Sequence, residues 1–558
     1  MSAKATQVRI APDEKWYLRR DILLRITLAL TFLVYLRSVG FDFVFDDHLQ
    51  IALNPWLDSW RHLPTYFTRQ LWAFVDFHIP SKFYRPMLMV WFASVGHILG
   101  TAPGWYHLAT VLLHVLVVGE AFVFARLLFR DDLTAVITAA LFGLHPTKVE
   151  AVAWISGGNE PLFAAFFLGA FICYLRAGAA EKHVRWTICA LALFLLALFS
   201  KEQAVVGPAI LAAYEFWDRR SEALVTRLRR TVVAIVPYVL VGGVFWAIRW
   251  HVMHGLTDLS SQISIRKTLL TQPLIWLWYV RHLVFPFHLS LFYPDLIVRE
   301  FSVTRVLMPA LVLLAIAGVV WHFARRSGEG ALLVALFGLT LAPPAAMVLL
   351  VQPHDRHLYL PEFAVAAAAA VAIRRFIASK PAQMAAAGTL TLILAVGTFT
   401  GSSQWENDVT VMERAVESAP DNNEVRMMLG AAYIDAGQEQ RGVATLREAA
   451  MREPDNIEAW QQLGAHEYTS SQYEAAYEDF KRAVAATHYT DKSYSMYSLG
   501  LISLQLGRPA EAEQWAREAI AIDGRIPSYH LALASVLEAE GRRSEAQKER
   551  AVAASLKR

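Results

Sequence analysis

The chain has 558 residues, of which 55% are hydrophobic, 12% aromatic and only 18% charged. This composition excludes an ordinary soluble enzyme, which is about one-quarter charged, and it also excludes a collagen-like, coiled-coil or disordered chain. Residues 1–400 carry a net charge of +11 and residues 401–558 a net charge of −8, so an apolar membrane body followed by a polar tail is predicted.

The first apolar stretch, residues 22–39, follows Arg19 and Arg20 and approaches the length of about 20 residues that crosses a bilayer core. It lacks a small-residue cleavage site, which favours a retained span over a signal peptide. Further stretches predict eleven to thirteen spans in all; they lie near 86–100, 105–128, 133–145, 161–176, 187–200, 203–217, 231–250, 272–288, 304–323, 331–351, 359–373 and 384–400.

Basic clusters predict the orientation, because lysine and arginine favour the cytoplasmic side of a membrane. They occur at 15–20, 219–230, 325–326 and 374–380. We therefore expect a cytoplasmic N-terminus, with the first loop (41–85) and the tail on the opposite side. The basic loop 219–230 is explained by this topology, so no nucleic-acid partner is predicted.

The first loop carries the adjacent acids Asp46 and Asp47, directly after the aromatic-rich run 41–45. Adjacent carboxylates repel, so one of them tends to keep its proton to higher pH, and such a group can act as a general base near neutrality. The alternative is a solvated loop in which an aspartate caps a helix. The aromatic setting at a membrane surface favours the functional interpretation and leaves open which acid is the base.

Polar residues interrupt the apolar runs at four later places. Ionisable groups in such runs are costly, so a functional role is the default hypothesis. For two of these places a structural explanation is the alternative to a functional role: the Lys201 side chain could snorkel to the membrane surface, and residues 354–357 could form a tight turn. The interruptions are Tyr84-Arg85-Pro86, the region containing His145, Glu150 and Glu160, Lys201-Glu202, and His354 to Tyr359. By contrast His97, His107 and His114 follow helical spacings within apolar runs, which favours core positions or hydrogen bonds between helices.

The tail repeats every 34 residues. Pro-Asp-Asn occurs at 420–422 and 454–456, Leu-Gly begins at 429 and 463 and again 36 residues later at 499, and Gly-Arg begins at 507 and 541. This period is typical of tetratricopeptide helix pairs, of which three to four fit in 409–558. The predicted fold is therefore all-α: a polytopic helical bundle over 1–400, then an α-solenoid over 401–558. Such arrays usually bind peptides or proteins, with a purely structural cap as the alternative.

Other chemistries are not indicated. The chain has no Gly-rich nucleotide loop and no His-Glu-x-x-His zinc motif. Its two cysteines, Cys173 and Cys189, lie in apolar runs, which excludes a disulfide framework and a cysteine-based zinc site.

Taken together, the order of these motifs resembles that of the transmembrane and tetratricopeptide-repeat-containing protein O-mannosyltransferases and, more broadly, the multispanning GT-C glycosyltransferases. The matching motifs are the Asp-Asp pair, Tyr84-Arg85-Pro86, His145-Pro146 with Glu150-Ala151-Val152 and Glu160, Lys201-Glu202-Gln203, Arg356-His357-Leu358-Tyr359-Leu360-Pro361, and the repeat tail. The resemblance implies transfer of mannose or another hexose from a polyprenyl-phosphate donor in the membrane lipid to a hydroxyl of a protein or glycan outside the cytoplasm.

The resemblance also implies roles for single residues. Asp46 or Asp47 would orient or deprotonate the acceptor hydroxyl and help to bind a divalent metal, Mn²⁺ or Mg²⁺. Arg85, Lys201 and Arg356 would neutralise the donor phosphate. The cavity would be lined by His145, Glu150, Glu160, Glu202, His354, His357 and Tyr359.

The chain departs from this family in three respects. His357 stands where an aromatic residue is expected, the repeats are fewer, and there is no Asn-X-Ser/Thr sequon. These departures favour a bacterial inner-membrane protein with a periplasmic tail over an endoplasmic-reticulum protein with a lumenal tail. A catalytically silent membrane scaffold with a recruiting tail is the alternative function. A lipid transporter is disfavoured, because 1–400 shows no internal symmetry.

Overall fold

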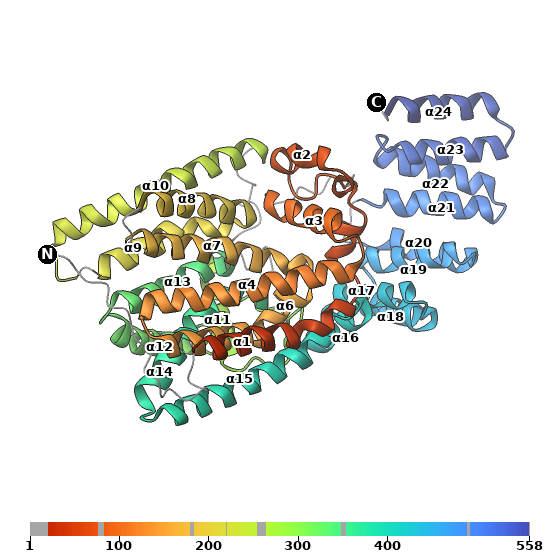
Figure 1. The fold of residues 1–558 in the computed structure, drawn as a ribbon. Helices are drawn as coiled ribbons and strands as arrows, with labels where there is room; N and C mark the ends of the chain where they lie inside the picture. The colour runs from red at the N-terminus through yellow and green to blue at the C-terminus, as the bar shows by residue number, and fades with distance from the viewer. Residues whose placement is uncertain are drawn as a thin grey trace. The chain divides into compact units, whose positions relative to one another are not determined.

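The computed structural model describes residues 20–75, 83–178, 183–218, 220–253, 264–346, 353–487 and 491–556. Every regular element in these ranges is a helix (Figure 1), which confirms the all-α prediction. The chain forms two compact units, Met1–Val411 and Met412–Arg558.

The first unit is built from helices that pack side by side (Figure 1). Helix α4 packs against α5 and α7, α7 against α8, and α9 against α10 and α13. The longer helices are α1 (Arg20–Tyr35), α3 (Pro86–Ile98), α4 (Pro103–Phe129), α5 (Asp132–Gly143), α7 (Asn159–Ala177), α8 (His183–Ser200), α9 (Gly207–Asp218), α10 (Leu224–Val252), α11 (Ile265–Val284), α12 (Met308–Ala324), α13 (Gly328–Ala346), α14 (Pro361–Phe376) and α15 (Lys380–Ser402).

Eight helical segments of the described part are long and apolar enough to cross a membrane, which supports a multi-pass protein. They are Arg20–Gly40, Pro103–Phe129, Ser156–Ala177, His183–Ser200, Leu224–Val252, Val303–Ala324, Gly328–Ala346 and Lys380–Trp405. Helices α3 and α5 are apolar but have only 13 and 12 residues, too few for a full crossing. The count of eleven to thirteen spans therefore stays a prediction.

Basic residues from separate helices meet at one end of this unit. The Arg20 guanidinium lies 3.3 Å from an Asp132 carboxylate oxygen, and Arg126 lies 2.6 Å from the other oxygen of Asp132. Next to them, Arg374 pairs with Asp131 at 3.1 Å. The start of α1 and the end of α14 thus share the end that their basic residues predict to be cytoplasmic. The first loop follows the far end of α1.

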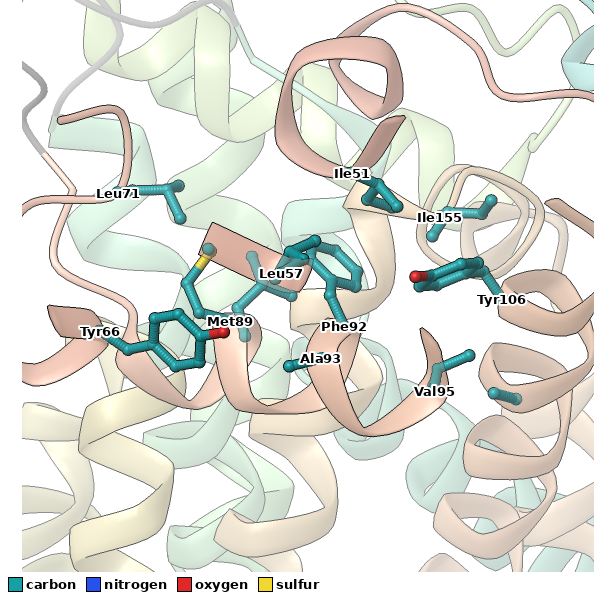
Figure 2. Packing of buried hydrophobic residues seen from close by; sticks show 12 residues of the cluster. Ile51, Leu57, Tyr66, Leu71, Met89, Phe92, Ala93, Val95, Tyr106 and Ile155 are labelled. Carbon is teal, nitrogen blue, oxygen red and sulfur yellow. The ribbon is translucent and has the colours of Figure 1, made fainter. Parts of the chain in front are cut away.

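The first loop is packed rather than solvated. Its residues form short helices, η3 (His48–Ala52), η4 (Pro55–Asp58), η5 (Trp60–His62) and α2 (Leu63–Thr68). Their apolar side chains are buried against α3 and the start of α4 (Figure 2), in a cluster that includes Ile51, Leu57, Tyr66, Met89, Phe92 and Tyr106. Burial of this much apolar surface fixes the backbone that carries Asp46 and Asp47.

The second unit confirms the tetratricopeptide prediction. After α16 (Asp408–Ser418), which begins in the first unit, the described residues form four helix pairs. Their helices are α17 (Asn423–Asp435), α18 (Glu439–Arg452), α19 (Ile457–Thr469), α20 (Tyr473–Ala485), α21 (Ser493–Gln505), α22 (Pro509–Ile522), α23 (Pro527–Ala539) and α24 (Arg543–Leu556).

The repeated motifs have clear local roles. Asn422 and Asn456, the last residues of the two Pro-Asp-Asn motifs, accept hydrogen bonds from the first-turn amides of α17 and α19. A Cβ atom added at Gly430 would lie 2.7 Å from Leu446, so only glycine lets the helices of this pair approach so closely. The period seen in the sequence is therefore a period of helix caps and helix contacts.

Candidate functional site

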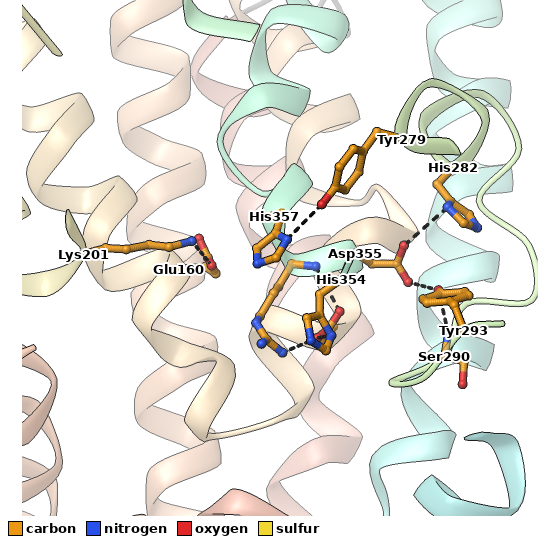
Figure 3. Close-up of polar contacts among 11 residues, drawn as sticks. Glu160, Lys201, Tyr279, His282, Ser290, Tyr293, His354, Asp355 and His357 are labelled. Carbon is orange, nitrogen blue, oxygen red and sulfur yellow. Dashed lines mark hydrogen bonds and ion pairs between the residues drawn. The ribbon is translucent and has the colours of Figure 1, made fainter. Parts of the chain in front are cut away.

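The candidate site lies at the end of the first unit opposite the Arg20–Asp132 pair. It combines the loop after α1, the start of α3, the junction between α8 and η8 (Glu202–Val206), and η10 (Asp355–Leu358). The polar segment between α5 and α7 completes it, with η6 (Pro146–Lys148), α6 (Val149–Ala153) and η7 (Ser156–Gly158). Figure 3 shows part of this polar cluster.

Asp47 is a fully buried structural acid. Its Oδ1 accepts hydrogen bonds from the Ser156 amide (2.7 Å) and the Ser156 hydroxyl (2.5 Å), and its Oδ2 accepts one from the Val44 amide (3.2 Å). Burial raises the pKa of the Asp47 carboxyl to about 7, although these hydrogen bonds lower it. Asp47 therefore ties the first loop to the 156–158 turn.

Asp46 has a different environment from its neighbour. It is half-buried, and its Oδ2 accepts one long hydrogen bond, from Gln50 at 3.3 Å. Burial raises the pKa of Asp46 above its usual value, while the positive charges of Arg356 and Arg85 lower it. An acid that is reachable, weakly bonded and close to cations is the better candidate for the general base.

Arg356 is held by a buried carboxylate. Its guanidinium Nη1 lies 2.5 Å from Glu150 Oε1, and its backbone amide donates to Glu150 Oε2 at 3.0 Å. His354 Nδ1 lies 3.1 Å from the same Oε1, and the guanidinium carbon lies 5.0 Å from the centre of the Trp154 ring. Glu150 thus holds in place a cation whose charge acts on Asp46.

The other two predicted cations are also paired with carboxylates. Lys201 donates to Glu160 in a buried pair (Figure 3). The Arg85 guanidinium lies 3.7 Å from Glu202, which also accepts from the Tyr84 amide at 3.1 Å. Carboxylates thus hold all three predicted phosphate-binding cations in fixed positions.

Several contacts of the site have no counterpart in the sequence motifs. Arg249, at the end of α10, lies 4.0 Å from Glu202 and is buried. The Tyr293 hydroxyl donates to Asp355, and the Tyr279 hydroxyl lies 3.0 Å from His357 Nδ1 (Figure 3). Tyr279 and Arg249 fall inside otherwise ordinary helices, and Tyr293 lies in a long loop, so only the fold reveals them.

Asp355, which accepts a hydrogen bond from Tyr293, also senses the charge of Glu150. Burial and the nearby Glu150 charge raise the pKa of Asp355 well above its usual value. Asp355 fixes the turn that presents His354 and Arg356.

His145 and Tyr359 brace the site from within the protein. The His145 ring bonds to the Thr147 hydroxyl (2.9 Å) and the Leu283 carbonyl (3.0 Å). The Tyr359 hydroxyl lies 2.6 Å from His114 Nδ1. The other ring nitrogen of His114 lies 3.0 Å from the Gly143 carbonyl of α5, which agrees with the interhelical bond predicted for that histidine, whereas His97 bonds to the Ala93 carbonyl of its own helix. Both predicted cavity-lining residues are thus buried against other parts of the fold.

The residues present do not fit a metal held by both aspartates. Both oxygens of Asp47 already accept hydrogen bonds, and the positive charges of Arg356 and Arg85 already act on Asp46. Among the described residues, no group of three or more His, Cys, Asp or Glu side chains is placed to hold a metal ion. No catalytic step is therefore assigned to a metal here.

An apolar cavity of about 630 Å³ lies between α8, α9 and α10. Its lining includes Tyr238, Gly242 and Gly243 of α10, and continues to Val205 of η8 and to Trp246. The Trp246 ring centre lies 5.1 Å from the Arg249 guanidinium carbon, and Val205 belongs to the short helix that begins at Glu202. The cavity thus runs towards the cations of the site.

Comparison with known proteins gives relatives for both parts of the chain. Tetratricopeptide repeat family models match residues 409–466 and 493–525. Among solved structures, a crystal structure of MamA is 23% identical, with a TM-score of 0.25, and the match covers 29% of this chain and 90% of that one.

Curated relatives extend the comparison to the membrane unit. Protein O-mannosyl-transferase TMTC3 of Homo sapiens is 34% identical over 184 residues, which are 32% of this chain and 20% of that protein. A protein O-mannosyl-transferase of Caenorhabditis elegans is 25% identical over 442 residues, 76% of this chain and 62% of that protein. The matches span between a fifth and about three-fifths of these relatives. The resemblance seen in the sequence is thereby confirmed: the homologues of this chain are named protein O-mannosyl-transferases, and its tail is a tetratricopeptide array.

Proposed function

We propose that the chain is a membrane glycosyltransferase of the GT-C type. It moves mannose or another hexose from a polyprenyl-phosphate donor to a hydroxyl of a protein or glycan acceptor outside the cytoplasm. The observation that carries this proposal is a half-buried Asp46 carboxylate within electrostatic range of two cations, Arg356 and Arg85, which Glu150 and Glu202 hold in place. A base and cations on one site match the two charge changes of this reaction.

The chemistry uses the residues in distinct roles. Asp46 takes the proton of the acceptor hydroxyl while the oxygen forms a bond to the anomeric carbon of the sugar. The bond from that carbon to the phosphate oxygen breaks, and its electron pair leaves with the phosphate, which gains one negative charge. Arg85, Lys201 and Arg356 stabilise this charge. Because their carboxylate partners hold them beforehand, little reorganisation is needed during the reaction.

The apolar cavity supports a site for the prenyl chain of the donor. Its lining is apolar and leads along α10 to Trp246, next to Arg249. A ligand with a long hydrocarbon chain and an anionic head matches this combination. The repeat unit then binds the acceptor or a partner protein, as such arrays do.

The cavity assignment can be tested by filling it. A side chain at Gly242 would extend into open space, because an added Cβ meets no atom within 4 Å. We expect Gly242→Phe to raise the donor KM about 10-fold with little change in kcat, since it removes binding shared by the ground and transition states. The donor KM and kcat are measured in a steady-state assay of sugar transfer from polyprenyl-phosphate-mannose to a peptide.

The matched control is Gly338→Phe, which fills a separate cavity beside Trp217 and Trp321, also without a clash. It should keep the donor KM of the wild type. Equal effects of the two substitutions would contradict a chain site at α10.

The function itself is tested by incubating the purified chain with that donor and a serine- and threonine-containing peptide. A hexose-sized mass increase on the peptide is expected, and it should form far more slowly with Asp46→Asn. A chain that binds a partner through its repeats but transfers no sugar from any polyprenyl-phosphate hexose would instead be the membrane scaffold. The bacterial inner membrane remains the predicted location.

A further inference from the structure

One distant residue contacts the chain on both sides of the Asp46–Asp47 pair. The Phe45 amide donates to Asp408 Oδ1 at 2.8 Å, and His48 Nε2 lies 2.7 Å from Asp408 Oδ2. Asp408 belongs to the first unit and is the first residue of α16. A single carboxylate therefore contacts the residue before Asp46 and the residue after Asp47.

The conformation that Asp408 holds is an unusual one. Phe45 has a φ of +51°, in the left-handed region that bulky side chains rarely adopt. Such a conformation persists only where surrounding contacts over-determine it, and it is often found at functional sites. Here the contacts are the Asp408 hydrogen bond and ring contacts of Phe45 with Trp154 and Phe292, each with 6.0 Å between ring centres.

Neighbours of Asp408 reinforce the same contact. The Asp42 amide donates to the Glu406 carbonyl at 3.1 Å. The Trp405 ring stacks on Trp154, with ring centres 5.4 Å apart and an angle of 12° between the planes. Trp154 in turn lies next to the Arg356 guanidinium. Residues 405–408 thus touch both the loop of the candidate base and a residue that supports a candidate phosphate-binding cation.

We propose that Asp408 is a positioning residue for the transfer reaction. It holds the left-handed Phe45 and the His48 ring, and so keeps the two acids apart, with Asp47 bonded to Ser156 and Asp46 bonded to Gln50. This role rests on the proposed glycosyltransferase function. On this proposal, Asp408, the first residue of α16, positions the candidate base Asp46, and α16 leads into the repeat array.

Three variants of the full chain test the proposal. Asp408→Ala removes both contacts. Asp408→Asn keeps them, since the amide oxygen can accept from Phe45 and the amide nitrogen can donate to a neutral His48 ring. Asp421→Asn is the matched control, because Asp421 is exposed, lies in the turn before α17 and belongs to the second unit.

We expect Asp408→Ala to lower kcat about 10²-fold, as misplacing a catalytic group by about 1 Å does, with a donor KM within about threefold of the wild type. Asp408→Asn should retain activity within about threefold of the wild type, and Asp421→Asn should match the wild type. Amide hydrogen exchange without substrate should rise in peptides covering 41–49 in the alanine variant only.

Two results would overturn the proposal. One is wild-type kcat and wild-type exchange at 41–49 in Asp408→Ala. The other is a fall in kcat accompanied by faster exchange throughout the first unit and a lower melting temperature, which would show a general structural role. If the wild-type chain transfers no sugar, the proposed function fails, and the exchange measurement still decides whether Asp408 holds the loop.

Discussion

Replacing Asp46 with asparagine should lower the kcat of sugar transfer about 10³-fold while leaving the fold intact. Asparagine has the same shape and can still bond to Gln50, but it cannot take a proton from the acceptor hydroxyl. General-base catalysis usually contributes about 10²- to 10⁴-fold. Because Asp46 is half-buried and accepts a single long hydrogen bond, the melting temperature should stay close to that of the wild type.

The pH profile provides a second measurement on the same residue. Burial raises the pKa of Asp46 above its usual value, and only the deprotonated form can act as the base. Activity should therefore fall on acidification, with the midpoint of the acidic limb above the usual aspartate range. A flat profile through that range would contradict the assignment.

The control is Asp47→Asn, a matched change at the adjacent position. Its amide nitrogen would face the Val44 amide, so two donors would meet at a buried site that now holds an acceptor. We expect a loss of about 1–3 kcal/mol in unfolding free energy. Lost kcat without lost stability in Asp47→Asn, together with an active Asp46→Asn, would reverse the two roles.

Replacing Arg356 with alanine should have a large effect on both stability and activity. The substitution leaves the Glu150 carboxylate, which is 4% exposed, without its guanidinium partner. Removing one partner of a buried ion pair usually costs about 3–5 kcal/mol, because the other charge stays buried and uncompensated. Thermal unfolding in detergent should show this loss, and transfer should be abolished.

A double variant separates the structural role of Arg356 from its catalytic role. Combining Arg356→Ala with Glu150→Gln removes both charges, so most of the lost stability should return. Transfer should stay absent, because the cation that stabilises the leaving phosphate is still missing. Recovery of transfer in the double variant would show that Arg356 only balances Glu150.

Much of the fold could be predicted because its signals are periodic or local. The 34-residue period of the tail reflects helix caps at Asn422 and Asn456, which depend on neighbouring residues alone. The residue type at one position of the repeat changes once. Gly437, Gly507 and Gly541 have positive φ values in three turns, and Ser471 takes the corresponding place in the fourth with a φ of 60°. That substitution hides one repeat boundary from a search for glycine.

The site was predictable only in part. Asp46, Arg85, Lys201 and Arg356 interrupt apolar runs, and the fold brings them together around one cluster. The sequence could not distinguish Asp46 from Asp47, because adjacent residues enter different environments only once 156–158 has folded against the loop. Asp408 gave no functional signal either, since an aspartate at the start of a helix is normally read as a favourable charge there.

The contact between Asp408 and the loop around Phe45 also determines where the tail could be exchanged without disturbing the membrane unit. A chimaera joined at residue 400, directly after the last apolar stretch, would replace Asp408 together with the tail. The same exchange made after residue 411 would keep it. If tails have been swapped between such chains during evolution, the part inherited with the membrane unit should extend past the last apolar helix and include the first turn of α16.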